Sequence, residues 1–197
     1  MARNMQPVLK RCRTLGIEPT VMGIDKTSNR NPRPMKRKQS EYGRQLTEKQ
    51  KVKFIYGMLE KQFRKYYELA TKQQGITGEN LLQILESRLD NVVYRMTLAN
   101  TRRESRQMVG HGHVLVNGKR VDIPSYRVKV GDVITLKEQT KTSDRIKAIV
   151  EANSTRVVPK WIEMDKEALV GKVVALAQRD DIDFEVEEHL IVELYSK

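Results

Sequence analysis

Apolar positions recur at helical spacing over two stretches in the first half of the chain. The first stretch spans residues 52–63, and Thr47 ahead of it has the spacing of a capping box with Gln50, so we expect a helix that begins near Thr47. The second stretch predicts one amphipathic helix with a single apolar stripe, which consists of Leu81, Leu85, Leu89, Val92 and Met96.

A short helix and a β-hairpin are predicted between residues 101 and 121. Thr101 and Glu104 form another capping box at the start of this helix. The glycines on either side of His111 supply the C-cap at its end. After residue 113 the apolar period changes to two, and Asn117-Gly118 favours a type I′ turn between two short strands.

The rest of the chain combines strands, turns and two further helices. We expect a strand at 132–136, a helix at 143–152, short strands and turns at 157–178, and a final amphipathic helix at 187–194. The chain is therefore predicted to be an α+β protein.

Residues 1 to about 40 are expected to be irregular, because they contain several prolines and little apolar periodicity. A basic run at 33–38 is interrupted by Pro34, which disfavours a helix. Two interpretations stay open: a disordered tail in the free protein, or an extended arm that becomes ordered along RNA.

The charge of the chain points to a polyanionic partner. The sequence has 37 Lys and Arg against 25 Asp and Glu, a net charge of +12, with a pI near 9.8. Residues 1–53 hold 14 basic against 4 acidic residues, whereas residues 163–193 hold 10 acidic against 3 basic residues. Nucleic acid is the first candidate partner and an anionic membrane surface the second, although the basic residues do not gather on one amphipathic helix with aromatic anchors.

Cysteine and histidine usage argues against a metal site or cofactor. Cys12 is the only cysteine, which rules out an intrachain disulfide and a cysteine-rich zinc site. His111 and His113 have too few partners to be metal ligands, so hydrogen bonding to RNA or backbone is the better interpretation. Glu187, Glu188 and His189 are interpreted as a solvated helix face. No phosphate-binding loop, nucleophile elbow, membrane span of ~20 apolar residues or signal peptide is present, so we expect a soluble, cytoplasmic protein that is not an enzyme.

The helix after Thr101 and the following hairpin form the candidate RNA-binding site. The cap leaves backbone amides and the positive end of the helix dipole beside Arg102 and Arg103, where a phosphate could bind. Arg106 extends this track by one turn, and the hairpin adds a basic pair. The alternative is a solvated helix face in an ordinary α/β domain, and the short helix favours recognition of RNA shape and phosphate over reading of DNA bases.

Three segments carry a resemblance to a known family: residues 85–95 (LESRLDNVVYR), 106–113 (RQMVGHGH) and 116–121 (VNGKRV). They closely resemble the family of bacterial small-subunit ribosomal protein four. The flanks agree in the same order over nearly the whole chain, at residues 40–46, 56–64, 77–82 and 188–197.

The resemblance implies a domain organisation and a set of partners. It implies a basic arm at 1–40, a helical domain at 41–86 completed by 179–197, and an inserted RNA-binding domain at 87–178 with a core module at 87–150. The implied partners are small-subunit ribosomal RNA, ribosomal protein five of the same subunit, and messenger RNA near the channel through which it enters. The implied roles are early subunit assembly and decoding accuracy. Some relatives bind zinc through N-terminal cysteines, but Cys12 alone cannot, so no zinc is expected here.

The residues expected to contact RNA are mostly basic and occur in all three regions. They are Arg3, Lys10, Arg11, Arg13, Arg33, Lys36, Arg37, Lys38, Arg44, Lys49, Lys53, Arg64, Arg88, Arg95, Arg102, Arg103, Arg106, Gln107, His111, His113, Lys119, Arg120 and Tyr126.

Two other kinds of protein share the helix-pair and hairpin module. RNA-modifying enzymes and some tRNA ligases carry it beside a catalytic domain, for which this chain leaves little room. Stand-alone stress factors use it to bind stalled large subunits, but they lack the long basic N-terminal region.

Overall fold

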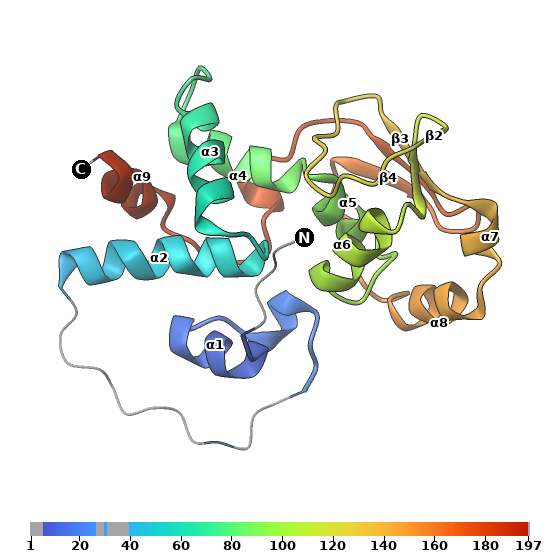
Figure 1. The fold of residues 1–197 in the computed structure, drawn as a ribbon, viewed down its shortest axis with the longest axis horizontal. Helices are drawn as coiled ribbons and strands as arrows, with labels where there is room; N and C mark the ends of the chain where they lie inside the picture. Colours follow the sequence, from blue (N-terminus) through green and yellow to red (C-terminus); the bar gives the residue numbers. More distant parts are fainter. Residues whose placement is uncertain (1–5, 27–29, 31–39, 197) are drawn as a thin grey trace. The chain divides into compact units, whose positions relative to one another are not determined.

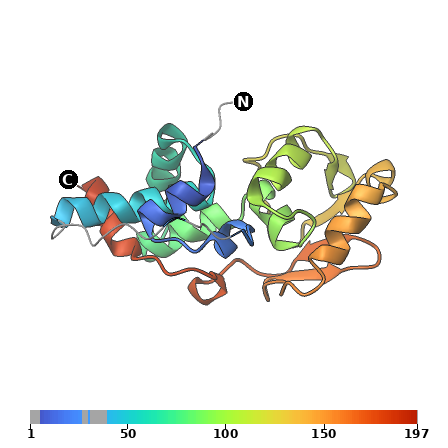
Figure 2. The same ribbon diagram turned by 90° about the horizontal axis from the view of Figure 1, so that it is seen from below.

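The computed structural model describes residues 6–26, 30 and 40–196, and the chain forms two compact units. Unit 1 comprises residues 1–82 and 183–197, and unit 2 comprises residues 83–182. Within the described ranges, no helix is both long and apolar enough to cross a membrane. Figures 1 and 2 show the helices of unit 1 and the mixed helices and strands of unit 2.

Unit 1 is helical, and its first helices correct the expectation of an irregular N-terminal region. Helix α1 spans Val8–Leu15 and the 3-10 helix η1 spans Pro19–Met22. Cys12, Leu15 and Met22 are buried, so a short apolar face is present that the prolines obscured. Pro7 precedes α1 and Pro19 opens η1, where a missing backbone N–H costs little. The basic run at 33–38 lies outside the described residues.

Helix α2, Glu41–Ile55, begins six residues before the predicted start at Thr47. Ser40 is its N-cap, and the Ser40 hydroxyl accepts a hydrogen bond from the Gly43 amide at 3.2 Å. The Thr47 hydroxyl instead donates to the Gly43 carbonyl at 2.7 Å, as expected inside a helix. The predicted helical stretch 52–63 is divided at Gly57, whose φ is +62°, and α3 spans Glu60–Ala70.

The predicted C-terminal helix is confirmed as α9, Glu188–Ser196, and it packs on α2 and α3 (Figure 1). The Tyr195 hydroxyl donates to the Glu60 carboxylate at 2.7 Å, and its ring stacks on Tyr67 with centroids 4.6 Å apart. Lys49 and Lys53 each donate to Glu60 at 2.8 Å. The C-terminus of the chain therefore completes the first helical unit.

Glu60 is expected to make the stability of unit 1 depend on pH. Burial alone would raise its pKa, but hydrogen bonds from Lys49, Lys53 and Tyr195 outweigh burial and lower the pKa from 4.5 to about 2. A lowered folded-state pKa stabilises the fold above the unfolded value, and that contribution is lost as pH falls from about 4.5 towards 2. The stability difference between wild type and Glu60→Gln, from urea titrations at several pH values, should shrink across this window.

A matched control is Glu79→Gln, which changes an exposed glutamate on α4 that makes no ion pair with the described residues. Its stability difference from wild type should stay nearly constant over the same pH range. A difference for Glu60→Gln that is equally constant would contradict the role given to the Glu60 cluster.

The predicted single helix over residues 81–96 is two helices, α4 (Thr77–Glu86) and α5 (Leu89–Arg95). Between them Arg88 is extended and forms an isolated β-bridge with Arg127. The Leu89 amide donates to the Tyr126 carbonyl at 2.8 Å, and the Val128 amide donates to the Ser87 carbonyl at 2.9 Å. The helix ends here because the Ser87 carbonyl and the Leu89 amide form hydrogen bonds with residues 126–128 and not within a continuous helix.

Unit 2 contains a five-stranded antiparallel sheet in the order β2-β1-β3-β5-β4. The predicted hairpin is confirmed, with positive φ at both Asn117 (+49°) and Gly118 (+76°), as a type I′ turn requires. The strand at 132–136, the helix at 143–152 and the short strands within 157–178 are also confirmed. The elements of this unit are α6 (Arg102–Gly110), β1 (Val114–Val116), β2 (Lys119–Arg120), β3 (Val133–Leu136), α7 (Glu138–Lys141), α8 (Asp144–Ala152), β4 (Ile162–Asp165), β5 (Val170–Val173) and η2 (Arg179–Asp181).

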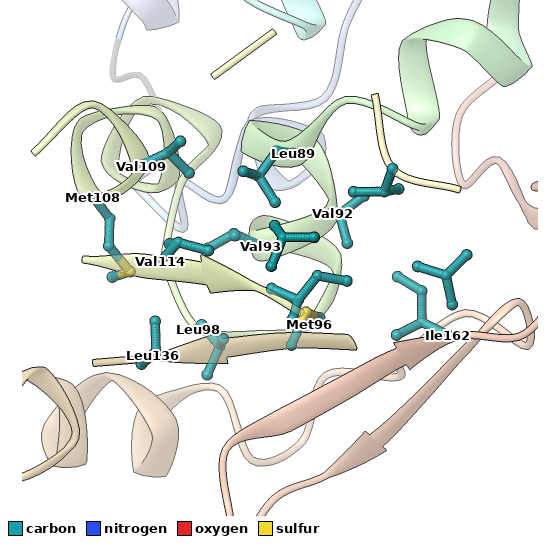
Figure 3. Close-up of a cluster of buried hydrophobic side chains, with 14 of the residues drawn as sticks. Leu89, Val92, Val93, Met96, Leu98, Met108, Val109, Val114, Leu136 and Ile162 are labelled. Atoms are coloured by element: carbon teal, nitrogen blue, oxygen red, sulfur yellow. The ribbon is translucent and has the colours of Figure 1, made fainter. Parts of the chain in front are cut away.

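Helices α5 and α6 pack against one face of this sheet. Figure 3 shows Val93 of α5 and Met96, the residue after this helix, lying between the helix and the strands that carry Val114 (β1) and Leu136 (β3), and all four residues are buried. Gly171 of β5 leaves room for Met96, because a Cβ at residue 171 would collide with the methionine side chain. The predicted α+β fold class is therefore confirmed. Because α5 and α6 cover one face of the sheet, the candidate site is sought on the opposite face.

Candidate nucleic-acid interface

Two arginines expected to contact RNA lie in the interior of unit 2. Arg88 is fully buried and pairs with Asp90 through two contacts, Nε to Oδ1 at 3.0 Å and Nη2 to Oδ2 at 2.6 Å. Arg95 pairs in the same two-pronged way with the buried carboxylate of Glu86, at 3.0 and 2.9 Å. Both guanidinium groups are therefore used to neutralise buried carboxylates, and the burial is at odds with direct RNA contact.

Arg102 belongs to the same buried network. Its Nε donates to the Asn91 side-chain carbonyl at 2.8 Å, and its guanidinium lies over the Tyr94 ring, 4.3 Å from the centroid. The Asn91 amide nitrogen in turn donates to Glu86 at 2.7 Å. Arg102 thus ties the start of α6 to α5 and points inward, whereas the next residue, Arg103, is exposed.

The first turn of α6 already carries a carboxylate of the chain itself. The predicted cap is confirmed, since the Thr101 hydroxyl accepts from the Glu104 amide at 3.2 Å. Glu104 accepts from the Asn100 amide at 3.0 Å and pairs with Arg145 at 2.7 Å. The Glu104 carboxylate therefore partly neutralises the positive charge at the anion site expected beside the cap. A stronger candidate for an anion-binding site lies at the other end of α6.

The exposed face of the sheet collects cations at its β2–β1 edge. Leu115 pairs with Arg120, and the Lys137 amide donates to the His113 carbonyl at 3.0 Å, which extends the β1–β3 ladder. Cross-strand partners share a face and side chains alternate, so His113, Arg120 and Lys137 lie on the face opposite buried Val114. The register brings together residues from three separate strand ends.

A close backbone approach positions Arg120. Gly112 has a φ of +70°, and a Cβ at this residue would collide with the Arg120 guanidinium. The His111 and His113 rings lie 6.2 Å apart between their centroids. Burial, followed by the charges of His111, Lys137 and Arg120, lowers the pKa of His113.

The other predicted residues of unit 2 fall into exposed and half-buried groups. Gln107, His111, Lys119 and Arg120 are exposed like Arg103. The half-buried group consists of Arg106, which approaches Asp90 at 4.0 Å, together with His113 and Tyr126.

The predicted residues of unit 1 are more dispersed. Lys10 and Arg13 are exposed on α1, and half-buried Arg11 contacts Gln50. Four others form ion pairs with carboxylates: Arg44 with Glu41 and Glu187, Lys49 and Lys53 with Glu60, and Arg64 with Glu68. Arg3, Arg33, Lys36, Arg37 and Lys38 lie outside the described residues.

Lys137 was missed by reasoning from the sequence. Lys137 lies between β3 and the short helix α7, and no sequence motif includes it. Only the pairing of β1 with β3 brings it opposite His113. Among the described residues, no three His, Cys, Asp or Glu side chains are grouped so that they could hold a metal ion.

Comparison with known proteins identifies both halves of the chain. A model described as the ribosomal protein S4/S9 N-terminal domain matches residues 3–86, and a model described as the S4 domain matches residues 87–134. The small ribosomal subunit protein uS4 of Lachnoclostridium phytofermentans is 60% identical over 198 residues, and that of Lachnospira eligens is 58% identical over 197 residues. The uS4 protein of Fusobacterium nucleatum is 53% identical, and each alignment covers 100% of both chains.

These relatives are named as proteins of the ribosome and not as enzymes. The resemblance seen in residues 85–121 and their flanks is confirmed by identity over the full length. The chain belongs to the uS4 family of small ribosomal subunit proteins.

Proposed function

We propose that this protein is a structural constituent of the small ribosomal subunit that binds small-subunit ribosomal RNA directly, through the exposed basic surface of unit 2. The observation that carries the proposal is the group of exposed Lys119 and Arg120 with half-buried Lys137, which form no ion pair with any carboxylate of the described residues. Phosphates are the natural partners of such cations, and the S4 domain matched here includes Lys119 and Arg120.

Arg103 and Gln107 are exposed on α6 and precede His111 at steps of four residues, so they share one stripe of the helix with it, while Arg88, Arg95 and Arg102 are buried in the unit. The exposed cations interact with the RNA backbone, and the buried arginines keep α5, α6 and the hairpin in a fixed arrangement. Binding is mainly electrostatic and directed by RNA shape, without chemical turnover.

The finer roles in the proposal are those that the family resemblance implies. The protein nucleates assembly of the small subunit in the bacterial cytoplasm, and with ribosomal protein five it contributes to translational accuracy. The basic run at 33–38 binds messenger RNA near the channel through which it enters. The strongly basic N-terminal third of the chain supports this assignment of the arm.

A salt titration tests the electrostatic proposal. The probe is a multi-helix junction fragment from the 5′ domain of small-subunit ribosomal RNA, with binding followed by fluorescence anisotropy. If about six phosphates are neutralised, affinity should fall on the order of 10³-fold between about 50 and 200 mM salt. A nearly flat dependence would overturn the proposal.

Sedimentation of a tagged copy through a gradient tests the ribosomal assignment separately. Migration with small subunits is expected. Migration with large subunits would favour a stand-alone stress or ribosome-rescue factor.

A further inference from the structure

Four cationic or ionisable side chains meet where α6 turns into β1. His111 and His113 come from the turn itself, Arg120 comes from β2, and Lys137 is the residue between β3 and α7. The Arg120 guanidinium lies over Gly112, between the two histidines in sequence, and the backbone of Lys137 bonds to that of His113. The α6–β1 turn, β2 and the residue after β3 therefore bring basic side chains together beside Gly112.

Within the part of the chain that the structure describes, no acidic side chain pairs with the cations of this cluster. The charged groups that act on His113 are His111, Lys137 and Arg120, all of them basic. Neither Arg120 nor Lys137 is paired with a carboxylate of the described residues. An isolated cluster of this kind is electrostatically unfavourable until an anion enters it.

The ring of His113 is held so that one nitrogen remains for a ligand. Its Nδ1 lies 3.0 Å from the Thr140 hydroxyl oxygen, which leaves Nε2 as the other polar atom of the ring. A hydroxyl can donate to a neutral ring nitrogen and accept from a protonated one, so the Thr140 contact is compatible with both charge states. His113 can therefore gain a proton without losing its position.

We propose that His111, His113, Arg120 and Lys137 form one anion site that binds an RNA phosphodiester together with a proton taken up by His113. The inference rests on the proposed function and adds to it the location of one phosphate and a dependence on pH. Arg120 and Lys137 supply permanent charge, and protonated His113 donates from Nε2 to a phosphate oxygen while Nδ1–H donates to Thr140.

The direction of the pH effect follows from the charges. In the free protein, burial and three basic neighbours lower the pKa of His113 below 6.5, so the ring is neutral at neutral pH. A phosphate cancels the repulsion and raises this pKa in the complex. Affinity should therefore increase as pH falls through the interval between the bound and the free pKa, and should be independent of pH above it.

The test measures RNA affinity against pH at fixed salt for the full chain and two histidine variants. Wild type should bind the junction fragment about tenfold more tightly at about pH 5.5 than at about pH 7.5, because binding raises the pKa of His113. His113→Gln should lose most of this dependence. His189→Gln, which alters the exposed histidine of α9, should keep it.

A second measurement follows the His113 ring directly by NMR, with and without the RNA fragment. The pKa of His113 should be higher in the complex, and Arg120→Ala should reduce the increase. RNA binding without pH dependence, or a dependence that persists in His113→Gln, would overturn the anion site and leave the proposed function standing. Absence of RNA binding at every pH would overturn both.

Discussion

Replacing Glu86 by leucine is expected to lower the free energy of unfolding of unit 2 by about 3–5 kcal/mol. The Glu86 side chain is 1% exposed and accepts two hydrogen bonds from Arg95 and one from the Asn91 side chain. Leucine removes the negative charge and both acceptors of the hydrogen bonds that the buried Arg95 guanidinium donates to Glu86. Urea unfolding followed by fluorescence of Trp161, the single tryptophan and a buried residue of unit 2, measures the loss.

A double variant separates the lost pairing from the lost volume. Arg95→Met alone should be strongly destabilising for the converse reason, because the buried Glu86 carboxylate loses the two hydrogen bonds that Arg95 donates to it. Glu86→Leu with Arg95→Met removes both charges and should be more stable than either single variant. A double variant whose destabilisation equals the sum of the two single effects would contradict the coupling.

The exposed ion pair between Glu104 and Arg145 provides a matched control. Its Arg145 side chain is 76% exposed, so Arg145→Met should cost no more than about 1 kcal/mol. The contrast tests whether burial, and not ion pairing as such, makes Arg95 essential to the fold.

Turns and helix caps could be predicted from the sequence because they depend on residues that are close to one another in the chain. The type I′ turn at Asn117-Gly118 requires positive φ at two successive residues, which few other residue pairs tolerate. The Thr101 cap is likewise a contact between residues three apart. Both could be identified without knowledge of the tertiary structure.

The break between α4 and α5 could not be found in this way. The apolar stripe continues across residues 87–88 because Leu85 and Leu89 both face the interior, although from different helices. The chain is extended at Arg88 only because residues 126–128 supply backbone partners. The apolar periodicity of residues 81–96 carries no information about residues 126–128.

The same limit applied to the arginines of the candidate site. A spacing of seven places Arg88 and Arg95 on a common helix face in a single helix, but it does not say whether that face is turned to solvent. The sequence did contain one indication, since Glu86 and Asp90 lie within a few residues of them and could act as internal partners. Packing against the sheet determines which arginines are buried and which are exposed.

Charge reversal on the exposed surface is expected to give the largest loss of RNA affinity. Changing Lys119, Arg120 and Lys137 together to glutamate should weaken binding of the junction fragment on the order of 100-fold at about 0.1 M salt, because three phosphate contacts become repulsive. The slope of log affinity against log salt should fall by about two to three. Anisotropy titrations measure both quantities, and the Trp161 unfolding curve should change little because the native side chains make no ion pairs with described residues.

A control variant with the same change of net charge decides whether position matters. Lys147, Lys160 and Lys166 are exposed residues of unit 2 that lie on α8 and on the loops before and after β4. Their joint replacement by glutamate should weaken binding only a few-fold, since these side chains are outside the proposed surface and act on RNA only through screened, long-range attraction. Equal losses in the two triple variants would show that the total charge of +12, and not the β2–β1 edge of the sheet, determines the affinity. Unequal losses in the expected order would locate the RNA on the face opposite the α5–α6 core, where the register of three strands gathers cations that the interior does not neutralise.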